Sequence, residues 1–219
     1  LDGGRKPVEL LALGEVGPGM RVAELMAGGG YTVELLARAV GEEGTVYGVN
    51  SAFVLERFAE APWAERLTRP VNATVVRLDR EYTDPLPDDV TGLDRVFSVL
   101  VYHDFVRMET DRAAMNADLF RAMKPGGLYV VLDHSAAEGT GVQHVKELHR
   151  IDEAVVRAEV QAAADAAVDG TAVDYVATGG VEDVFAIVEA AIEKARDSSK
   201  PSLIACKTTI GFGAPNKQG

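Results

Sequence analysis

Short apolar runs alternate along most of the chain with segments of helical periodicity. Five of these runs are short, apolar and rich in β-branched residues, which predicts strands. They span residues 20–26, 45–49, 73–78, 95–102 and 128–132. The fourth run is almost continuously apolar, as is typical of a parallel strand whose two faces are both covered.

Four segments between and after these runs carry apolar side chains at helical spacing. They span residues 31–40, 53–67, 110–123 and 145–164. Pro62 interrupts the second segment, and Thr110 can cap the third. In the last segment, Val145, Leu148 and Ile151 begin one apolar face.

The order of these elements predicts the fold class. Repeated strand and helix alternation with short connections favours an α/β fold with a doubly wound, mainly parallel sheet and helices on both faces. The chain has no internal repeat and no Pro- or Ser-rich linker, so residues 1–219 are expected to form a single domain. The composition changes after the Ala-rich stretch at 161–167, and residues 165–219 are expected to be an atypical ending that completes the sheet.

Charge and cysteine usage narrow the classes of partner. The 219 residues include 22 basic and 34 acidic side chains, for a net charge of −12, and no Lys/Arg-rich run. Nucleic acid and anionic membranes are therefore not expected as partners, because both require a clustered positive field. No apolar stretch approaches the roughly 20 residues that span a bilayer. Cys206 is the one cysteine and cannot form an internal disulfide, which favours a cytoplasmic location.

The connection after the first predicted strand is the candidate ligand site. In a doubly wound sheet, ligands bind beyond the carboxyl ends of the strands near the switch point. Here the chain reads Glu24-Leu25-Met26-Ala27 and then three glycines, Gly28 to Gly30. Glycines let a ligand approach the backbone, and the following helix N-terminus favours an anionic group. A tight turn without a ligand is the alternative interpretation.

Several ordered motifs resemble a bacterial family of class I S-adenosylmethionine-dependent methyltransferases over residues 1–164. They read VAELMAGGGYTVELLA, VYGVN, RLDREY, LVYHDF, AMKPGGLYVVLDHSA and LHRIDEAVVRAEV. The resemblance implies a Rossmann-like fold with S-adenosylmethionine as cofactor and an unidentified small molecule as methyl acceptor. The turn is not Gly-x-Gly-x-x-Gly, because Met26 occupies a glycine position, which disfavours a nicotinamide cofactor.

The resemblance also assigns cofactor-binding residues. Glu24 supplies the acid of the motif, and Ala27, Gly28, Gly29 and Gly30 form the turn over which the cofactor lies.

Two further cofactor contacts are implied after the next two strands. Asn50 stands where the class usually has an acidic residue for the ribose hydroxyls, and an amide there gives a weaker grip. Asp79 matches a position that often contacts the adenine amino group. A solvated loop carboxylate is its alternative interpretation.

Candidate catalytic residues follow the fourth predicted strand. His103 and Asp104 stand where the resembled class places residues that face the transferred methyl group. A histidine there can take a proton from the acceptor, so His103 is the candidate general base. A structural loop histidine is the alternative.

Other histidines are expected near the same sheet edge. His134 follows Asp133 at the end of the fifth predicted strand, and His149 lies one turn from Asp152 on the predicted helix. These spacings match no known ligand signature, so no metal site is expected.

The end of the chain resembles a different family. Residues 178–219, and most specifically 200–219, are similar to the thiamine-diphosphate-binding domain of transketolase, but the Gly-Asp-Gly motif of that family is absent and a thiamine enzyme is not expected. Strands at 173–177 and 202–210, joined by a helix at 181–199, are predicted to extend the sheet in parallel, with Cys206 buried. Two unrelated resemblances indicate a chimeric or designed chain. The predicted function is methyl transfer, and the alternative is a non-catalytic α/β scaffold that retains at most cofactor binding.

Overall fold

The structure is a computed structural model that describes residues 7–167 and the backbone of residues 202–208. Within these residues, six strands form one sheet in the order β3-β2-β1-β4-β5-β6. The strands are β1 (Arg21–Leu25), β2 (Thr45–Asn50), β3 (Val75–Asp79), β4 (Leu93–Val99), β5 (Met123–His134) and β6 (Ser202–Thr208). Every described pair of neighbouring strands is parallel. The prediction of a doubly wound α/β sheet is confirmed.

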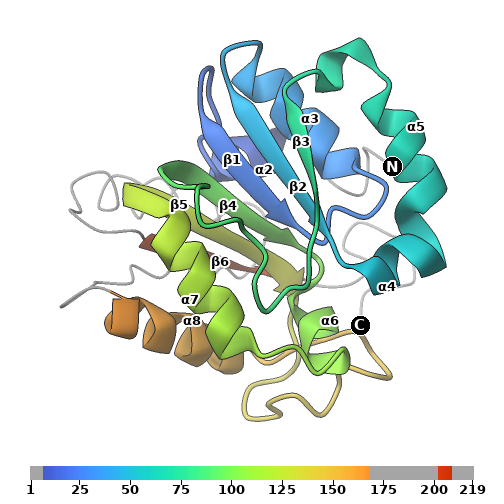
Figure 1. Cartoon of the computed structure of the whole chain (residues 1–219). Coiled ribbons are helices and arrows are strands. Elements are labelled where there is room, and N and C mark those ends of the chain that lie inside the picture. Colours follow the sequence, from blue (N-terminus) through green and yellow to red (C-terminus); the bar gives the residue numbers. More distant parts are fainter. Residues whose placement is uncertain (1–6, 168–201, 209–219) are drawn as a thin grey trace.

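Helices cover both faces of the sheet. They are α2 (Pro7–Leu13), α3 (Tyr31–Val40), α4 (Ala52–Val54), α5 (Glu60–Leu67), α6 (Tyr102–Arg107), α7 (Arg112–Ala122) and α8 (Glu153–Ala167). In Figure 1, α2 and α3 lie behind the sheet, and α7 lies in front of it with α8 beside α7. Among the described residues, no helix is both long and apolar enough to cross a membrane.

The core forms because apolar residues of the strands meet apolar faces of these helices. Val22, Leu25 and Val96 of the sheet are fully buried, as are Val33 and Leu36 of α3. Burying each such side chain stabilises the fold by roughly 1.5–3 kcal/mol. This core fixes the carboxyl edge of the sheet, where the predicted site residues lie.

The predicted segment 53–67 is helical but not continuous. It consists of α4, a π-helical turn (Leu55–Ala59) and α5. Pro62 lacks an N–H and cannot donate to the preceding turn, which accounts for the wide turn directly before it. A short 3₁₀ turn (Pro70–Asn72) then leads into β3.

Three predicted boundaries were wrong. β4 ends at Val99, because Leu100 adopts a left-handed φ of 60° and the apolar residues after it begin α6. The cap of α7 is Asp111, whose side chain accepts a hydrogen bond from Ala114 N, and not Thr110. α8 begins at Glu153, so the predicted first turns of the 145–164 helix are loop and turn instead.

The ending confirms part of the topological prediction. β6 pairs in parallel with β5, from Leu128 opposite Ser202 to His134 opposite Thr208. The predicted strand at 173–177, the helix at 181–199, the tail from 211 and the side chain of Cys206 lie outside the described residues.

Candidate functional site

The connection between β1 and α3 lies where the strand order reverses, between β1 and β4. Three of its residues have left-handed backbones, with φ of 53° at Met26, 54° at Gly28 and 76° at Gly30. Ala27 N donates to Val49 O (3.0 Å), and Gly30 N donates to Ala27 O (2.8 Å). These bonds hold the turn against β2 and set the first residue of α3.

The three glycines of this turn differ in what surrounds them. A Cβ built on Gly30 would overlap the ring of Trp63, which is fully buried, and one on Gly29 would lie 3.3 Å from Pro62 Cβ. A Cβ on Gly28 would meet no atom closer than 4.0 Å. Gly30 is therefore required for packing, whereas Gly28 is the position at which a ligand can approach the backbone.

Asn50, at the end of β2, is bonded to the same turn. Gly28 N donates to Asn50 Oδ1 (2.8 Å), and Asn50 Nδ2 donates to Gly28 O (3.1 Å). The Asn50 side chain is fully buried, so its amide holds the turn in place. The expected contact with a ribose stays a prediction.

Glu24 and Asp79 have contrasting environments. Glu24 is 4% exposed in the middle of the sheet, one residue before the end of β1. Asp79 lies opposite Asn50 at the end of β3 and is half exposed. It accepts hydrogen bonds from Arg77 Nε (2.7 Å) and Nη2 (2.9 Å), and Arg77 also pairs with Glu60. The expected adenine contact of Asp79 stays a prediction, and Arg77 already partners the carboxylate it would use.

A buried ion cluster attaches the glycine turn to α5. Arg66 Nε donates to Gly29 O (2.6 Å), and Arg66 Nη1 donates to Glu34 Oε2 (2.7 Å). Glu34 also accepts from Arg38 (2.8 Å) and Arg69 (2.9 Å). Hydrogen bonds from Arg38, Arg66 and Arg69 lower the pKa of Glu34 to about 2, although burial opposes them. The sequence shows only the i,i+4 spacing of Glu34 and Arg38 and gives no sign of the other two partners.

His103 lies in the first turn of α6, directly beyond β4, and is 3% exposed. Its Nδ1 is 2.7 Å from Asp133 Oδ1, and its backbone N donates to Asp133 Oδ2 (2.8 Å). Burial lowers the pKa of His103, but the hydrogen bond and the charge of Asp133, with a smaller contribution from Asp104, outweigh burial and raise it overall. Asp133 therefore orients His103 and stabilises its charged form.

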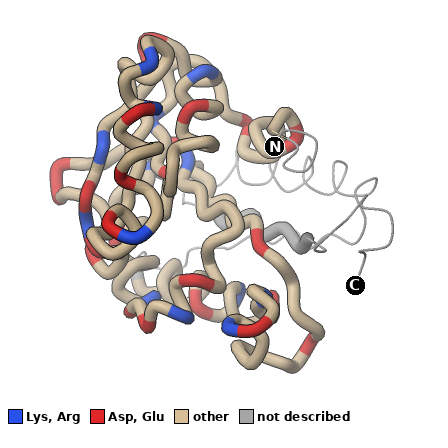
Figure 2. The backbone as a smooth tube through the Cα atoms, turned by 90° about the vertical axis from the view of Figure 1, so that its right-hand side faces the viewer, with Lys and Arg blue, Asp and Glu red and all other residues tan. Residues whose placement is uncertain are grey.

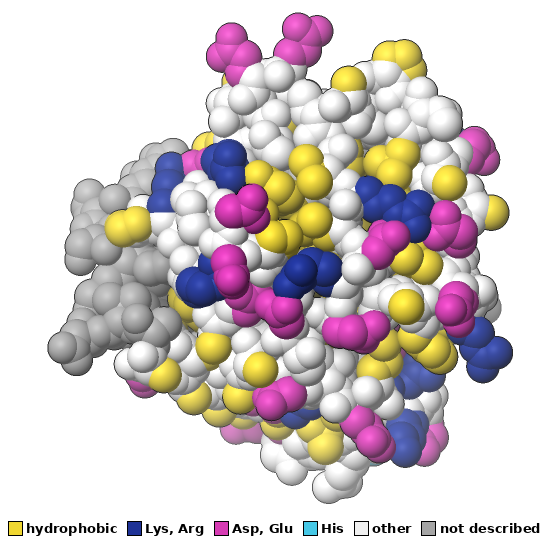
Figure 3. Space-filling view, in the orientation of Figure 1, with side chains coloured by type: hydrophobic (Ala, Val, Ile, Leu, Met, Phe, Trp, Pro, Cys, Tyr) yellow, Lys and Arg dark blue, Asp and Glu magenta, His cyan; other side chains and the backbone are white. Residues whose placement is uncertain are grey.

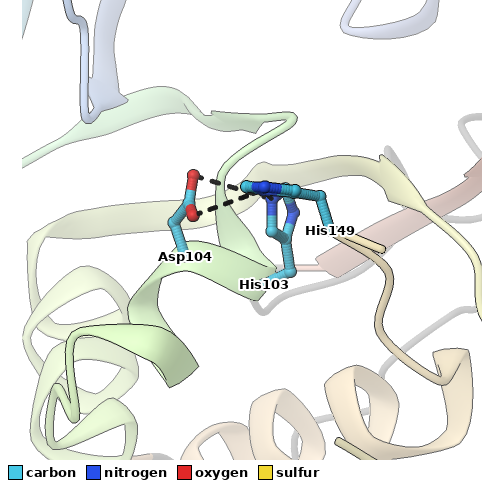
Figure 4. A group of neighbouring side chains, drawn as sticks. All are labelled: His103, Asp104 and His149. Atoms are coloured by element: carbon cyan, nitrogen blue, oxygen red, sulfur yellow. Dashed lines mark hydrogen bonds and ion pairs between the residues drawn. The ribbon is translucent and has the colours of Figure 1, made fainter. Parts of the chain in front are cut away.

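The other ring nitrogen of His103 faces two further side chains (Figure 4). His103 Nε2 is 3.2 Å from His149 Nδ1 and 3.6 Å from Asp104 Oδ2. His149 Nδ1 and Asp104 Oδ1 are 4.0 Å apart. Arg107 Nη1 lies 2.5 Å from Asp104 Oδ1 and 3.4 Å from His149 Nδ1.

His149 reaches this position by a route that the sequence analysis predicted wrongly. His149 and Asp152 do not share a helix: both precede α8, and His149 has a left-handed φ of 51°. Ile151 N donates to His134 O (3.0 Å), which pairs this loop with the end of β5. Asp152 accepts from Ala154 N (3.0 Å) and so caps the start of α8. The loop thus returns to the carboxyl edge of the sheet and carries His149 with it.

Charged side chains of both signs surround the site. Along the described backbone in Figure 2, basic and acidic residues alternate and basic residues form no continuous stripe. On the face seen in Figure 3, apolar side chains gather near the middle, with acidic and basic ones around them.

The end of the chain matches known transketolases. The family model for the transketolase thiamine-diphosphate-binding domain matches residues 154–219. The transketolase of Cereibacter sphaeroides is 66% identical over 32 residues, which are 15% of this chain and 5% of the relative. The probable transketolase of Streptococcus pneumoniae matches with the same identity and coverage. The chain thus spans about one twentieth of the length of these relatives.

Solved methyltransferase structures match most of the chain. A S-adenosylmethionine-dependent methyltransferase from Aquifex aeolicus has a TM-score of 0.56 at 21% identity and covers 72% of this chain and 78% of its own. The YcgJ protein from Bacillus subtilis has a TM-score of 0.56 at 16% identity, with 74% and 68% covered. Phosphoethanolamine N-methyltransferase 2 of Haemonchus contortus has a TM-score of 0.55 at 17% identity, with 73% and 36% covered. The chain therefore has the Rossmann-like fold of S-adenosylmethionine-dependent methyltransferases.

Proposed function

We propose that this chain, with a methyltransferase fold and an open glycine at its switch point, binds S-adenosylmethionine and transfers the methyl group to a small acceptor. The observation that carries the proposal is the environment of Gly28. Its backbone lies at the carboxyl end of β1, where ligands bind in doubly wound sheets, and nothing occupies the space that a side chain would take.

The residues around Gly28 fit a cofactor of this kind. The turn precedes α3, and a helix N-terminus favours the carboxylate of the methionine part. Asn50 and the cluster around Glu34 fix the shape of the turn before any ligand arrives, which reduces the entropy lost on binding. Glu24, Ala27, Gly29, Gly30 and Asp79 complete the proposed cofactor side.

When bound, the cofactor supplies a methyl group on a positively charged sulfur atom. The chain contributes position: the turn is at the end of β1, and His103 and Asp104 follow the neighbouring strand β4. We assign His103 and Asp104 to the acceptor side, because they approach the same edge of the sheet from the other side of the switch point. Holding the two reactants in such a geometry can supply roughly 7–11 kcal/mol of the barrier reduction.

The experiment is a calorimetric titration with S-adenosylhomocysteine, together with thermal unfolding. We expect binding and a rise in melting temperature, since a ligand that binds only the folded state stabilises it. Gly28→Ala should lower the affinity at least about tenfold, because its methyl group occupies the ligand's space at a turn with φ of 54°.

Gly41→Ala is the matched control. Gly41 also has a left-handed φ, 68°, with open space around it, but it lies at the far end of α3. It carries the same backbone strain without touching the turn, so its affinity for S-adenosylhomocysteine should stay that of the parent. No binding by the parent at millimolar ligand, or equal losses in the two variants, would contradict the proposal.

The match of residues 154–219 to transketolase favours a second candidate, a non-catalytic scaffold whose ending was replaced. A scaffold that keeps its turn binds S-adenosylhomocysteine but shows no methyl transfer. Incubation with labelled S-adenosylmethionine and a panel of small hydroxyl, amine and thiol acceptors distinguishes the two candidates.

A further inference from the structure

Three potential metal ligands converge at the carboxyl edge of the sheet, on the side of β4 (Figure 4). His103 and Asp104 are consecutive residues of α6, and His149 comes from the loop before α8. They are separated by up to 46 positions in the chain, so the fold and not a local motif brings them together. One donor atom from each residue lies within 4.8 Å of the other two.

The distances between these atoms are those of a metal site. Donors at about 2.0–2.1 Å from a tetrahedral ion lie about 3.3 Å from one another. The observed separations are 3.2 Å between the two imidazoles, 3.6 Å from His103 Nε2 to Asp104, and 4.0 Å from His149 Nδ1 to Asp104. A movement of less than 1 Å by the exposed His149 closes the widest gap.

Asp133 gives the site its supporting contact. Metal-bound histidines commonly donate their second ring N–H to a carboxylate, which fixes the tautomer and the ring orientation. His103 Nδ1 lies 2.7 Å from Asp133 Oδ1, and the backbone N–H groups of His103 and His134 hold the same carboxylate (2.8 and 2.7 Å). This arrangement turns His103 Nε2 toward His149 and Asp104 and is not needed for an exposed ion pair.

We propose that His103 Nε2, Asp104 and His149 Nδ1 bind a divalent transition-metal ion. Two imidazoles and one carboxylate suit Zn²⁺, Fe²⁺ or Co²⁺ better than Mg²⁺ or Ca²⁺, which prefer oxygen ligands. Three protein ligands leave a fourth position for water or another small molecule. The proposal concerns metal binding and does not depend on methyl transfer.

Arg107 is the competitor for this site. Its guanidinium contacts Asp104 and lies 3.4 Å from His149, so it holds positive charge where the ion would bind. Its side chain is 38% exposed and can turn into solvent. The metal therefore has to displace Arg107, which gives the proposal a distinctive test.

The experiment is titration of tag-free, chelator-treated full-length protein with Zn²⁺ by calorimetry, and with Co²⁺ by visible absorption. We expect one equivalent to bind, and His149→Gln to lower the affinity about 100-fold through loss of a ligand on an exposed loop. Arg107→Gln should raise it about tenfold, because removing an adjacent positive charge favours a cation.

Two control variants make the result specific. His144→Gln removes a histidine of the same loop that is outside the cluster, and Cys206→Ser removes the one thiol of the chain. Both should bind the metal as the parent does. The proposal is overturned if the parent binds no ion at about 100 µM, if His149→Gln and His144→Gln bind equally, or if Arg107→Gln weakens binding. Titration with S-adenosylhomocysteine reports on the glycine turn separately, so failure of one proposal is distinguishable from failure of the other.

Discussion

Replacement of Glu34 by Gln tests whether the ion cluster stabilises the glycine turn. Glu34 accepts hydrogen bonds from Arg38, Arg66 and Arg69, and its side chain is only 11% exposed. Its pKa falls from 4.5 to about 2 on folding, which corresponds to about 3 kcal/mol of stabilisation of the charged carboxylate. Glu34→Gln should therefore lower the free energy of unfolding by about 3 kcal/mol at pH 7.

The pH dependence of this loss follows from the direction of the pKa shift. A carboxylate with a lowered folded-state pKa stabilises the protein fully above its unfolded pKa of about 4.5, and the contribution is lost as the pH falls toward about 2. The parent and Glu34→Gln should thus differ by the full amount at pH 7, by less at pH 4, and hardly at all near pH 2. Other carboxylates titrate in both proteins, so the difference between them isolates Glu34.

Urea unfolding at a series of pH values measures this difference. Glu65→Gln is the control, because Glu65 pairs with Arg69 at 3.5 Å and is 76% exposed, and such surface pairs contribute about 0–1 kcal/mol. The reasoning is refuted if Glu34→Gln changes the free energy of unfolding at pH 7 no more than Glu65→Gln does. A loss that stays constant from pH 7 to pH 3 would also refute it, since it would show a packing defect and not a charge effect.

Two further substitutions probe the turn itself. Gly30→Ala should destabilise the protein by about 3 kcal/mol in urea unfolding, because the methyl group overlaps Trp63 at a φ of 76°; a loss below that of Gly41→Ala would show that the packing is not tight. Asn50→Asp should cost about 2 kcal/mol and weaken S-adenosylhomocysteine binding in calorimetry, because a carboxylate cannot donate to Gly28 O. Tighter binding by this variant would instead support a ribose contact for residue 50.

The sequence predicts most of the strands because burial on both faces makes them continuous apolar runs. α3 has the predicted bounds, since its buried face meets the sheet along its whole length. The end of β4 was missed for the same reason: the apolar residues after Val99 leave the sheet at Leu100 and are buried by α6 instead. Hydrophobicity reports burial, and it does not report which element buries a side chain.

The loop before α8 shows the same limit more strongly. Val145, Leu148 and Ile151 have helical spacing, yet Val145 and Ile151 are buried by different contacts and Leu148 is half exposed. Ile151 is buried because its backbone pairs beside the end of β5. Periodicity over two turns cannot distinguish such a loop from a helix, so the approach of His149 to His103 was not predictable from its supposed helix.

The candidate site was predictable where strand ends define it. Gly28 and His103 follow strands that were recognised, and the carboxyl ends of parallel strands meet at one edge. Trp63 and Arg66, which fix the glycine turn, come from α5 and have no local signal, because their partners lie more than 30 positions away. Long-range packing of this kind is determined by the whole fold.

The two resemblances of this chain are compatible with one working site. The transketolase match begins at residue 154, whereas every residue assigned here to the cofactor, acceptor or metal lies at or before His149. Among the described strands, β6 is at the edge of the sheet and contacts β5 through main-chain pairing, which places no demand on the family from which the strand came. Asp133 is oriented toward His103 by α6 and by the position of β5 next to β4. An ending from another family can therefore complete the sheet without supplying, or removing, any residue of the proposed chemistry.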